Sequence, residues 1–215
     1  MSCSAWFSGS EVPQDDPEPI LAICVGHSRA VDMGASSCDN TTTEWDYNLR
    51  VAKSMKERLD TLGVPSMIVC EYQGENYFDA MEWLGTFLKT KKVKAAIELH
   101  FNSASASAHG SEMLYWHRSS KGKEIAECLQ EVVVNEFKTR DRGIKPRTKQ
   151  ERGSKFLRVT PCPSVIAEPF FGSNMDDWNQ FKLNHDSLGV ALANGFNNYY
   201  NHETSRSKPK EGAQV

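Results

Sequence analysis

The chain has 215 residues, of which 39% are hydrophobic and 25% are charged, and its formal net charge is −3. This length is enough for one domain with a sizeable hydrophobic core. The near-neutral charge gives no electrostatic reason to expect a nucleic-acid partner. No stretch is long and apolar enough to cross a membrane, so membrane insertion is not expected.

The first 18 residues are expected to form an irregular arm. They lack the basic segment and the apolar run of a signal peptide, and they contain Asp15, Asp16 and Glu18 instead. We therefore expect the protein to be made in the cytoplasm. None of the six cysteines forms a CxxC pair, so a zinc-finger site is not expected either.

Apolar runs and helical periodicity alternate along the chain. The run ILAICV at 20–25 is rich in β-branched residues and ends at Gly26, which is typical of a strand buried on both faces. A first long helix opens at Glu44 and ends before Gly63. The same criteria predict strands at 65–70, 94–99, 112–116, 156–159 and 164–167, helices at 77–88, 120–138 and 183–200, and a polar loop at 139–155.

This alternation predicts an α/β fold, a three-layer sandwich whose central, mostly parallel sheet is flanked by helices. We expect a single domain at residues 19–202, without internal repeats. A polar tail at 203–215 is expected to be disordered.

Polar residues follow three of the predicted strands. His27, His100 and Glu168 stand at strand carboxyl ends, where ligands bind in open α/β sheets. Two histidines and a carboxylate such as Glu44 make a typical catalytic zinc set, which leaves a fourth position for water or substrate. The water then needs a general base that is not a ligand. Glu168 fits this role, because apolar neighbours would raise its pKa.

Each of these residues has an ordinary alternative. A lone histidine after a strand is usually a loop or core residue. Thr41 and Glu44 form the pattern T-x-x-E, and taken alone this pattern favours a helix capping box over a metal ligand. Glu168 alone is compatible with a solvated carboxylate at a strand end. The candidates lie far apart in the sequence, so they match no short motif such as HExxH.

The ordered set of segments from 20 to 200 resembles the zinc-dependent N-acetylmuramoyl-L-alanine amidases of bacterial autolysins and phage endolysins. GHSRAVDMGASS resembles the segment whose histidine binds zinc, here His27. TTTEWDYNLRVAKSMKERL and ELHFNSAS resemble the segments that supply the other two ligands, here Glu44 and His100. HGSEMLYW resembles the next strand. RGIKPR and LRVTPCPSVIAEPFFGSNMDD resemble the closing segment with the catalytic carboxylate, here Glu168.

Two residues depart from the family pattern. The family usually has a small residue two positions before the third ligand, and this chain has Glu98. Regular strand alternation places Glu98 on the same side as His100, where we expect it either to contact and orient the His100 ring or to alter the substrate fit. The family often has glycine after the catalytic glutamate, where this chain has Pro169.

Three residues are candidates for substrate binding. Asn102 stands close to the third ligand, and His109 lies in the loop that follows, although most such histidines are ordinary loop residues. Arg158 ends a basic segment at 138–158 and is a candidate contact to a carboxylate or to the acidic wall polymer. Most basic segments of this kind are merely solvated loops.

The resemblance implies a Zn²⁺ enzyme that uses activated water to cleave the peptidoglycan amide between N-acetylmuramic acid and the L-alanine of the stem peptide. The expected role is that of a monomeric phage endolysin, made in the host cytoplasm and acting on the cell wall from the periplasm. Two alternatives stay open. A zinc carboxypeptidase-like peptidase would need H-x-x-E, but Ala30 follows His27 at that spacing. A non-catalytic wall-binding protein would not need all four candidate residues.

Overall fold

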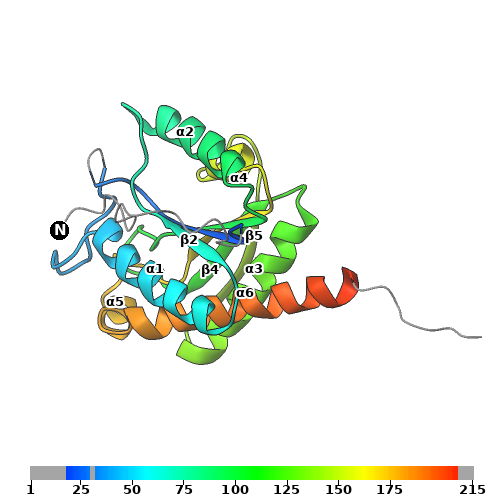
Figure 1. Cartoon of the computed structure of the whole chain (residues 1–215). Helices are drawn as coiled ribbons and strands as arrows, with labels where there is room; N and C mark the ends of the chain where they lie inside the picture. Colours follow the sequence, from blue (N-terminus) through cyan, green and yellow to red (C-terminus); the bar gives the residue numbers. More distant parts are fainter. Residues whose placement is uncertain (1–17, 30–31, 208–215) are drawn as a thin grey trace, which may run out of the picture.

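The computed structural model describes residues 18–29 and 32–207. Within them, six strands form one sheet in the order β2-β1-β3-β6-β4-β5, with six helices around it (Figure 1). The strands are β1 (Leu21–Val25), β2 (Ser66–Val69), β3 (Ala95–Leu99), β4 (Ser111–Trp116), β5 (Asp141–Arg147) and β6 (Ser164–Glu168). The helices are α1 (Glu44–Thr61), α2 (Tyr77–Thr90), α3 (Ser120–Phe137), α4 (Ser154–Val159), α5 (Met175–Phe181) and α6 (His185–Ser207).

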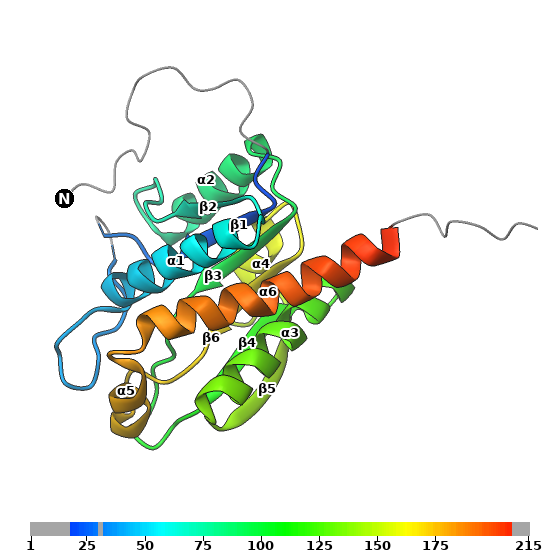
Figure 2. The same ribbon diagram turned by 60° about the horizontal axis from the view of Figure 1, so that its bottom comes forward.

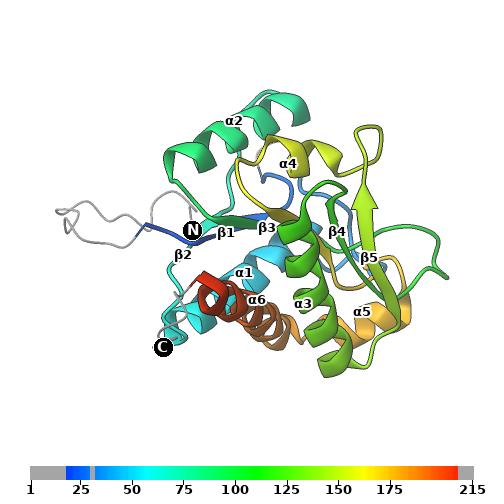
Figure 3. The same cartoon turned by 90° about the vertical axis from the view of Figure 1, so that its right-hand side faces the viewer.

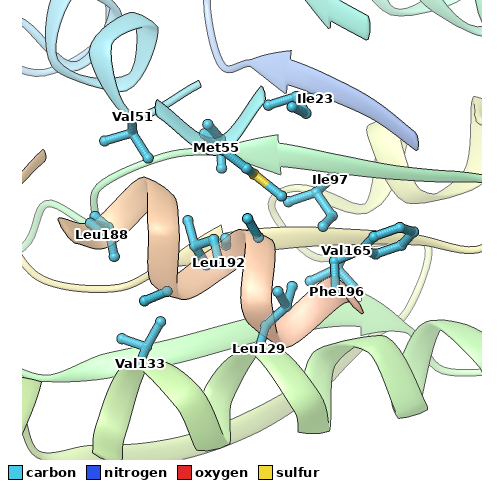
Figure 4. Close-up of a cluster of buried hydrophobic side chains, with 14 of the residues drawn as sticks. Ile23, Val51, Met55, Ile97, Leu129, Val133, Val165, Leu188, Leu192 and Phe196 are labelled. Carbon is cyan, nitrogen blue, oxygen red and sulfur yellow. The ribbon is translucent and has the colours of Figure 1, made fainter. Parts of the chain in front are cut away.

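Helices cover both faces of the sheet, which confirms the predicted three-layer sandwich. Figure 3 shows α2 and α4 on one side of the sheet and α1, α3 and α6 on the other. In Figure 2, α6 runs between α1 and α3. Ile23 of β1 packs on the α1, α3 and α6 side with Met55 and Leu192 (Figure 4), while Ala22 packs on the other side with Leu84. The strand is therefore buried on both faces, as its apolar run predicts.

The strand directions decide which residues meet. β1 is parallel to β2 and β3, and β3 is parallel to β6, so the carboxyl ends of β1, β3 and β6 lie at one edge of the sheet. β4 is antiparallel to β6 and places Glu112, near its own start, opposite Glu168 at the end of β6. The sheet is thus mostly parallel, as predicted, and its single antiparallel pairing brings one more carboxylate to the same edge.

Two predictions in the segment before β6 are wrong. The expected polar loop at 139–155 contains β5, an edge strand paired only with β4. Its largely polar sequence, DRGIKPR, fits that position, because Pro146 is tolerated at a sheet edge. The expected strand at 156–159 is the last part of helix α4. Its apolar run is too short for periodicity to distinguish a strand from a helix.

The closing helices also differ from the sequence prediction. The short helix α5 was not predicted; Asn174 caps its start, and it buries Trp178 and Phe181. Helix α6 continues to Ser207, so the first part of the expected tail, 203–207, is helical. The remainder of that tail and the expected arm up to residue 17 lie outside the described residues. No helix among the described residues is long and apolar enough to span a membrane.

Candidate active site

His27 lies just beyond β1 in a left-handed backbone conformation, with φ at 70°. Its ring is held from two sides. Nδ1 lies 3.0 Å from Oδ2 of Asp32, and Nε2 lies 3.3 Å from Oε2 of Glu44. Gly34, with φ at +76°, packs so closely that an added Cβ would lie 2.7 Å from the His27 ring and 2.8 Å from Oε2 of Glu44. The loop after β1 thus encloses both side chains.

Glu44 is the first residue of α1, and its carboxylate is almost fully buried. The alternative for Glu44, a capping box with Thr41, does not form, because Thr43 is the N-cap and accepts a hydrogen bond from the backbone N–H of Asp46 at 3.2 Å. The Glu44 side chain is therefore not used for capping. Its Oε1 atom lies 2.7 Å from Nδ1 of His100, at the end of β3.

These three side chains fit a zinc ion. His27, Glu44 and His100 each offer one donor atom, and the three atoms lie within 4.8 Å of one another. Ligands at normal Zn–N and Zn–O distances in a tetrahedral site are about 3.4 Å apart, which matches the separation between Nε2 of His27 and Oε2 of Glu44. Both histidines are partly exposed, so the site is accessible from solvent.

The electrostatics of the cluster keep the carboxylate ionised. Burial alone would raise the pKa of Glu44, but hydrogen bonds from His100 and His27 lower it to about 2. Burial would likewise lower the pKa of His100, whereas its hydrogen bonds to Glu44 and Glu98 raise it well above the ordinary range. The donor set is thus an ionised carboxylate between two imidazoles, a combination suited to a divalent metal.

Glu98 lies beside His100, on the side predicted from strand alternation. Its Oε2 atom is 3.3 Å from Nε2 of His100, and its Oε1 atom accepts a hydrogen bond from the Tyr72 hydroxyl at 3.2 Å. Glu98 is only 4% exposed, so its carboxylate is buried and does not point into solvent. With Nε2 of His100 facing Glu98, Nδ1 is the ring atom directed at Glu44 and available to a metal.

Glu168 ends β6 and is partly buried. Burial raises its pKa to about 7; the carboxylates of Glu112 and Glu44 add to this shift, while His100 opposes it. Asn102 donates a hydrogen bond to Oε2 of Glu168. A carboxyl group that titrates near neutral pH, within the electrostatic reach of the candidate metal ligands His100 and Glu44, is suited to accept and return a proton.

The three predicted substrate contacts have different positions. Asn102 lies inside the site, bonded to the carboxylates of Glu112 and Glu168. His109 is exposed in the loop before β4, where its Nδ1 atom is 3.1 Å from the backbone oxygen of Ser107.

Arg158 does not lie at the site. It belongs to α4 and lines a surface depression of about 510 Å³ together with Ser164, the first residue of β6. Glu168 is at the far end of the same strand, roughly 13 Å away along the chain. The prediction that Arg158 contacts substrate at this site is therefore wrong. Its basic segment folds into an edge strand and a short helix that lead away from the strand ends.

Four residues that sequence reasoning did not single out also border the site: Asp32, Tyr72, Glu112 and Arg142. A signal existed for Glu112, since a carboxylate in the otherwise apolar strand segment EMLYW must find a partner when it is buried. The direction of β4, which brings Glu112 to the site, is not encoded in that pattern.

Residues 21–198 match the profile of the family described as N-acetylmuramoyl-L-alanine amidase. The chain belongs to this amidase family. Among curated relatives, this amidase is 26% identical over 191 residues to the uncharacterized protein YqiI of Bacillus subtilis, covering 85% of this chain and 87% of YqiI. It is 24% identical over 174 residues to the N-acetylmuramoyl-L-alanine amidase LytC of B. subtilis, covering 79% of this chain. That match spans only 34% of LytC.

The fold is shared with solved amidase structures. The CwlD amidase from Clostridioides difficile, solved in complex with the GerS lipoprotein, aligns with a TM-score of 0.74 at 23% identity and covers 85% of this chain and 98% of CwlD. Family membership makes the protein a cell-wall amidase, a hydrolase that acts on peptidoglycan, as the ordered sequence segments predict.

Proposed function

We propose that this amidase hydrolyses the bond between N-acetylmuramic acid and the L-alanine of the stem peptide in a zinc-dependent reaction. The observation that carries the proposal is the convergence of three donor atoms from His27, Glu44 and His100 within 4.8 Å. Glu168, with a pKa of about 7, interacts electrostatically with His100 and Glu44 of the same cluster. Metal ligands and a separate proton-transfer group are the two parts that amide hydrolysis needs.

His27, Glu44 and His100 would hold the ion. A Zn²⁺ ion in this position supplies Lewis-acid polarisation of the scissile carbonyl and lowers the pKa of water. The surrounding residues orient the rings. Asp32 holds Nδ1 of His27, and Glu98 faces Nε2 of His100, so the remaining nitrogen of each ring is directed at Glu44.

Glu168 transfers the proton. Its Oε2 atom accepts a hydrogen bond from Asn102, which leaves Oε1 to take a proton from the attacking water. The same oxygen then gives this proton to the departing nitrogen of L-alanine as the C–N bond breaks. A pKa of about 7 serves both directions, because the ionised and protonated forms are both populated near neutral pH.

The test compares peptidoglycan hydrolysis by the wild type and by Glu168→Gln. The glutamine side chain has nearly the same shape but cannot accept the proton, so we expect activity to fall by about 100-fold or more while zinc binding is retained. Chelator should abolish wild-type activity, and added Zn²⁺ should restore it. Glu131→Gln, at an exposed position of α3, is the matched control. Full activity of a folded, zinc-loaded Glu168→Gln protein would refute the assignment.

The biological setting stays a prediction. The endolysin role expected from the sequence requires the protein to lyse a bacterium from inside once the membrane is opened. LytC is a bacterial protein, which favours action on the producing cell's own wall as the alternative role. Cytoplasmic expression with and without a membrane-permeabilising protein tests this, because an endolysin causes lysis only in the permeabilised cells.

The oligomeric state also stays a prediction. We propose a monomer, and the complex of CwlD with a lipoprotein makes a protein partner the alternative. Light scattering of the purified chain measures its mass in solution directly.

A further inference from the structure

The side-chain amide of Asn102 is held by three hydrogen bonds. Its Oδ1 atom accepts from the backbone N–H of Ser103 at 2.9 Å, and its Nδ2 atom donates to Oε1 of Glu112 at 2.9 Å and to Oε2 of Glu168. Ionised carboxylates only accept, so each takes one of the two amide hydrogens and the orientation of the amide is fixed.

The backbone of Asn102 is fixed as well. Its N–H donates to the carbonyl of Phe170 at 2.8 Å, and its own carbonyl accepts from the N–H of Gly172 at 2.9 Å. These bonds join the segment after β3 to the segment after β6, the two strand ends that carry His100 and Glu168. Asn102 is therefore anchored in both backbone and side chain, unlike a residue that reaches out to bind a ligand.

Glu112 is a buried carboxylate with a cationic partner. It is 6% exposed, and its Oε2 atom accepts a hydrogen bond from Nε of Arg142 at 2.8 Å. The guanidinium of Arg142 in turn lies 4.8 Å from the centre of the Phe171 ring. Burial of an ionised carboxylate costs free energy unless the group is paired. The hydrogen bond from Arg142 therefore stabilises Glu112 in its buried position.

Glu112 and Glu168 face each other as partners across β4 and β6. Two neighbouring carboxylates repel each other when both are ionised. The Asn102 amide donates a hydrogen bond to each of them and so offsets that repulsion. The contacts thus form a continuous chain from Arg142 through Glu112 and Asn102 to the proton-transfer group.

We propose that Arg142, Glu112 and Asn102 form a positioning chain that holds the Glu168 carboxylate in the orientation needed for proton transfer. This inference rests on the proposed function. Asn102 then acts through Glu168 and is not a substrate contact. Loss of Glu112 would leave one amide hydrogen of Asn102 without its acceptor, so the amide would rotate and Glu168 would lose its fixed donor.

A double-mutant cycle tests the connection between Glu112 and Asn102. We expect Glu112→Leu and Asn102→Ala each to lower kcat by up to about 100-fold, the loss that a small misplacement of a reacting group can cause. KM and zinc affinity should change by less than about twofold. The double variant should be no slower than the slower single variant, because each substitution breaks the same connection.

Conservative and control variants separate positioning from general damage. Glu112→Gln keeps an oxygen that can accept from Asn102, so it should retain more kcat than Glu112→Leu. Lys145→Met, on the same strand as Arg142, and Glu136→Leu, on the exposed side of α3, are the matched controls and should keep wild-type kcat. A purely structural role for Glu112 would instead lower thermal stability and zinc affinity along with kcat.

A second readout does not depend on activity. The side-chain NH₂ signals of Asn102, observed by NMR in the zinc-loaded protein, should be slow to exchange in the wild type and fast in Glu112→Leu. Unchanged exchange in Glu112→Leu, unchanged kcat, or losses that multiply in the double variant would each overturn the inference. If the wild type releases no amidase product, the proposed function fails, and the exchange measurement still decides whether the positioning chain exists.

Discussion

The Oε1 atom of Glu44 lies 2.7 Å from Nδ1 of His100, although 56 positions of sequence separate the two residues. The other oxygen of the same carboxylate is 3.3 Å from Nε2 of His27. The start of α1 and the ends of β1 and β3 therefore meet at one carboxylate, which contacts both histidines of the candidate donor set.

Replacement of Glu44 should weaken zinc binding more than replacement of Glu98. Glu44→Ala removes one of three ligands, so we expect zinc affinity to fall by more than the roughly 10- to 100-fold typical for loss of an outer partner. Competition with a chromophoric chelator measures the affinity. Glu57→Ala, at an exposed position of the same helix, is the control. Equal affinity in Glu44→Ala and wild type would exclude Glu44 as a ligand.

The carboxylate of Glu98 should strengthen zinc binding through His100. Glu98→Gln keeps the size of the side chain but removes the negative charge facing Nε2 of His100, so we expect zinc affinity to fall by roughly 10- to 100-fold. Tyr72→Phe removes only the hydroxyl that donates to Glu98 and should have a smaller effect in the same direction. The chelator assay ranks the variants, and an affinity in Glu98→Gln equal to that of the wild type would show that Glu98 does not act on the metal.

Gly26 should be intolerant of any side chain. A Cβ at this position would lie 2.5 Å from Nε2 of His100 and 2.7 Å from the backbone oxygen of Leu99. Gly26→Ala must therefore displace the ring or the strand, and we expect weaker zinc binding together with a loss of about 1–3 kcal/mol in the free energy of unfolding. Urea unfolding and the chelator assay measure the two effects. Unchanged values in both would mean that His100 lies elsewhere.

The pH dependence of the free energy of unfolding should reveal the raised pKa of Glu168. Its folded-state pKa of about 7 is above the ordinary value of 4.5, so between these values the folded protein holds a proton that the unfolded chain releases. The contribution of Glu168 to the free energy of unfolding is therefore fully present below pH 4.5. It decreases as the pH rises to 7, by roughly 3 kcal/mol in total.

Glu168→Gln cannot ionise, so its stability relative to the wild type should increase from pH 4.5 to 7. Urea unfolding of the metal-free proteins across this range measures the difference directly. Comparison with the variant is needed, because other ionisable groups also contribute to the pH dependence of wild-type stability. Parallel stability curves for the two proteins would show that the pKa of Glu168 is not raised.

Sequence patterns singled out the residues at the ends of apolar strands as candidates, and the family resemblance then favoured a metal or catalytic role over an ordinary one. His100 follows such a run directly, Glu168 ends one and His27 lies two residues beyond one, and parallel strands bring these ends together. Glu44 was a candidate because it opens the first long helix, but its local pattern favoured a cap, which Thr43 provides instead, so the family resemblance was needed to favour Glu44 as a ligand. Local pattern does not reveal which threonine caps a helix when several precede it, as in TTTE.

Glu112 and Arg142 were not predicted from the sequence, because one depends on the direction of its strand and the other lies in a strand with a weak sequence pattern. Glu112 reaches the site only because β4 is antiparallel to β6, and the side-chain periodicity of a strand is the same in either direction. Arg142 lies in an edge strand with too few apolar residues to be recognised. Arg158 was assigned to the cleft from its nearness in sequence to Glu168, but the intervening strand carries it to the opposite end of the sheet.

Mass spectrometry of purified peptidoglycan digested by the wild type, with and without chelator, distinguishes a metal-dependent amidase from a peptidase and from a wall-binding protein. A metal-dependent amidase should release intact stem peptides with a free L-alanine amino group, and only in the absence of chelator. Shortened stem peptides would instead reveal a peptidase, and binding to the wall without any cleaved product would reveal a binding protein. Either result would contradict a metal-dependent amidase.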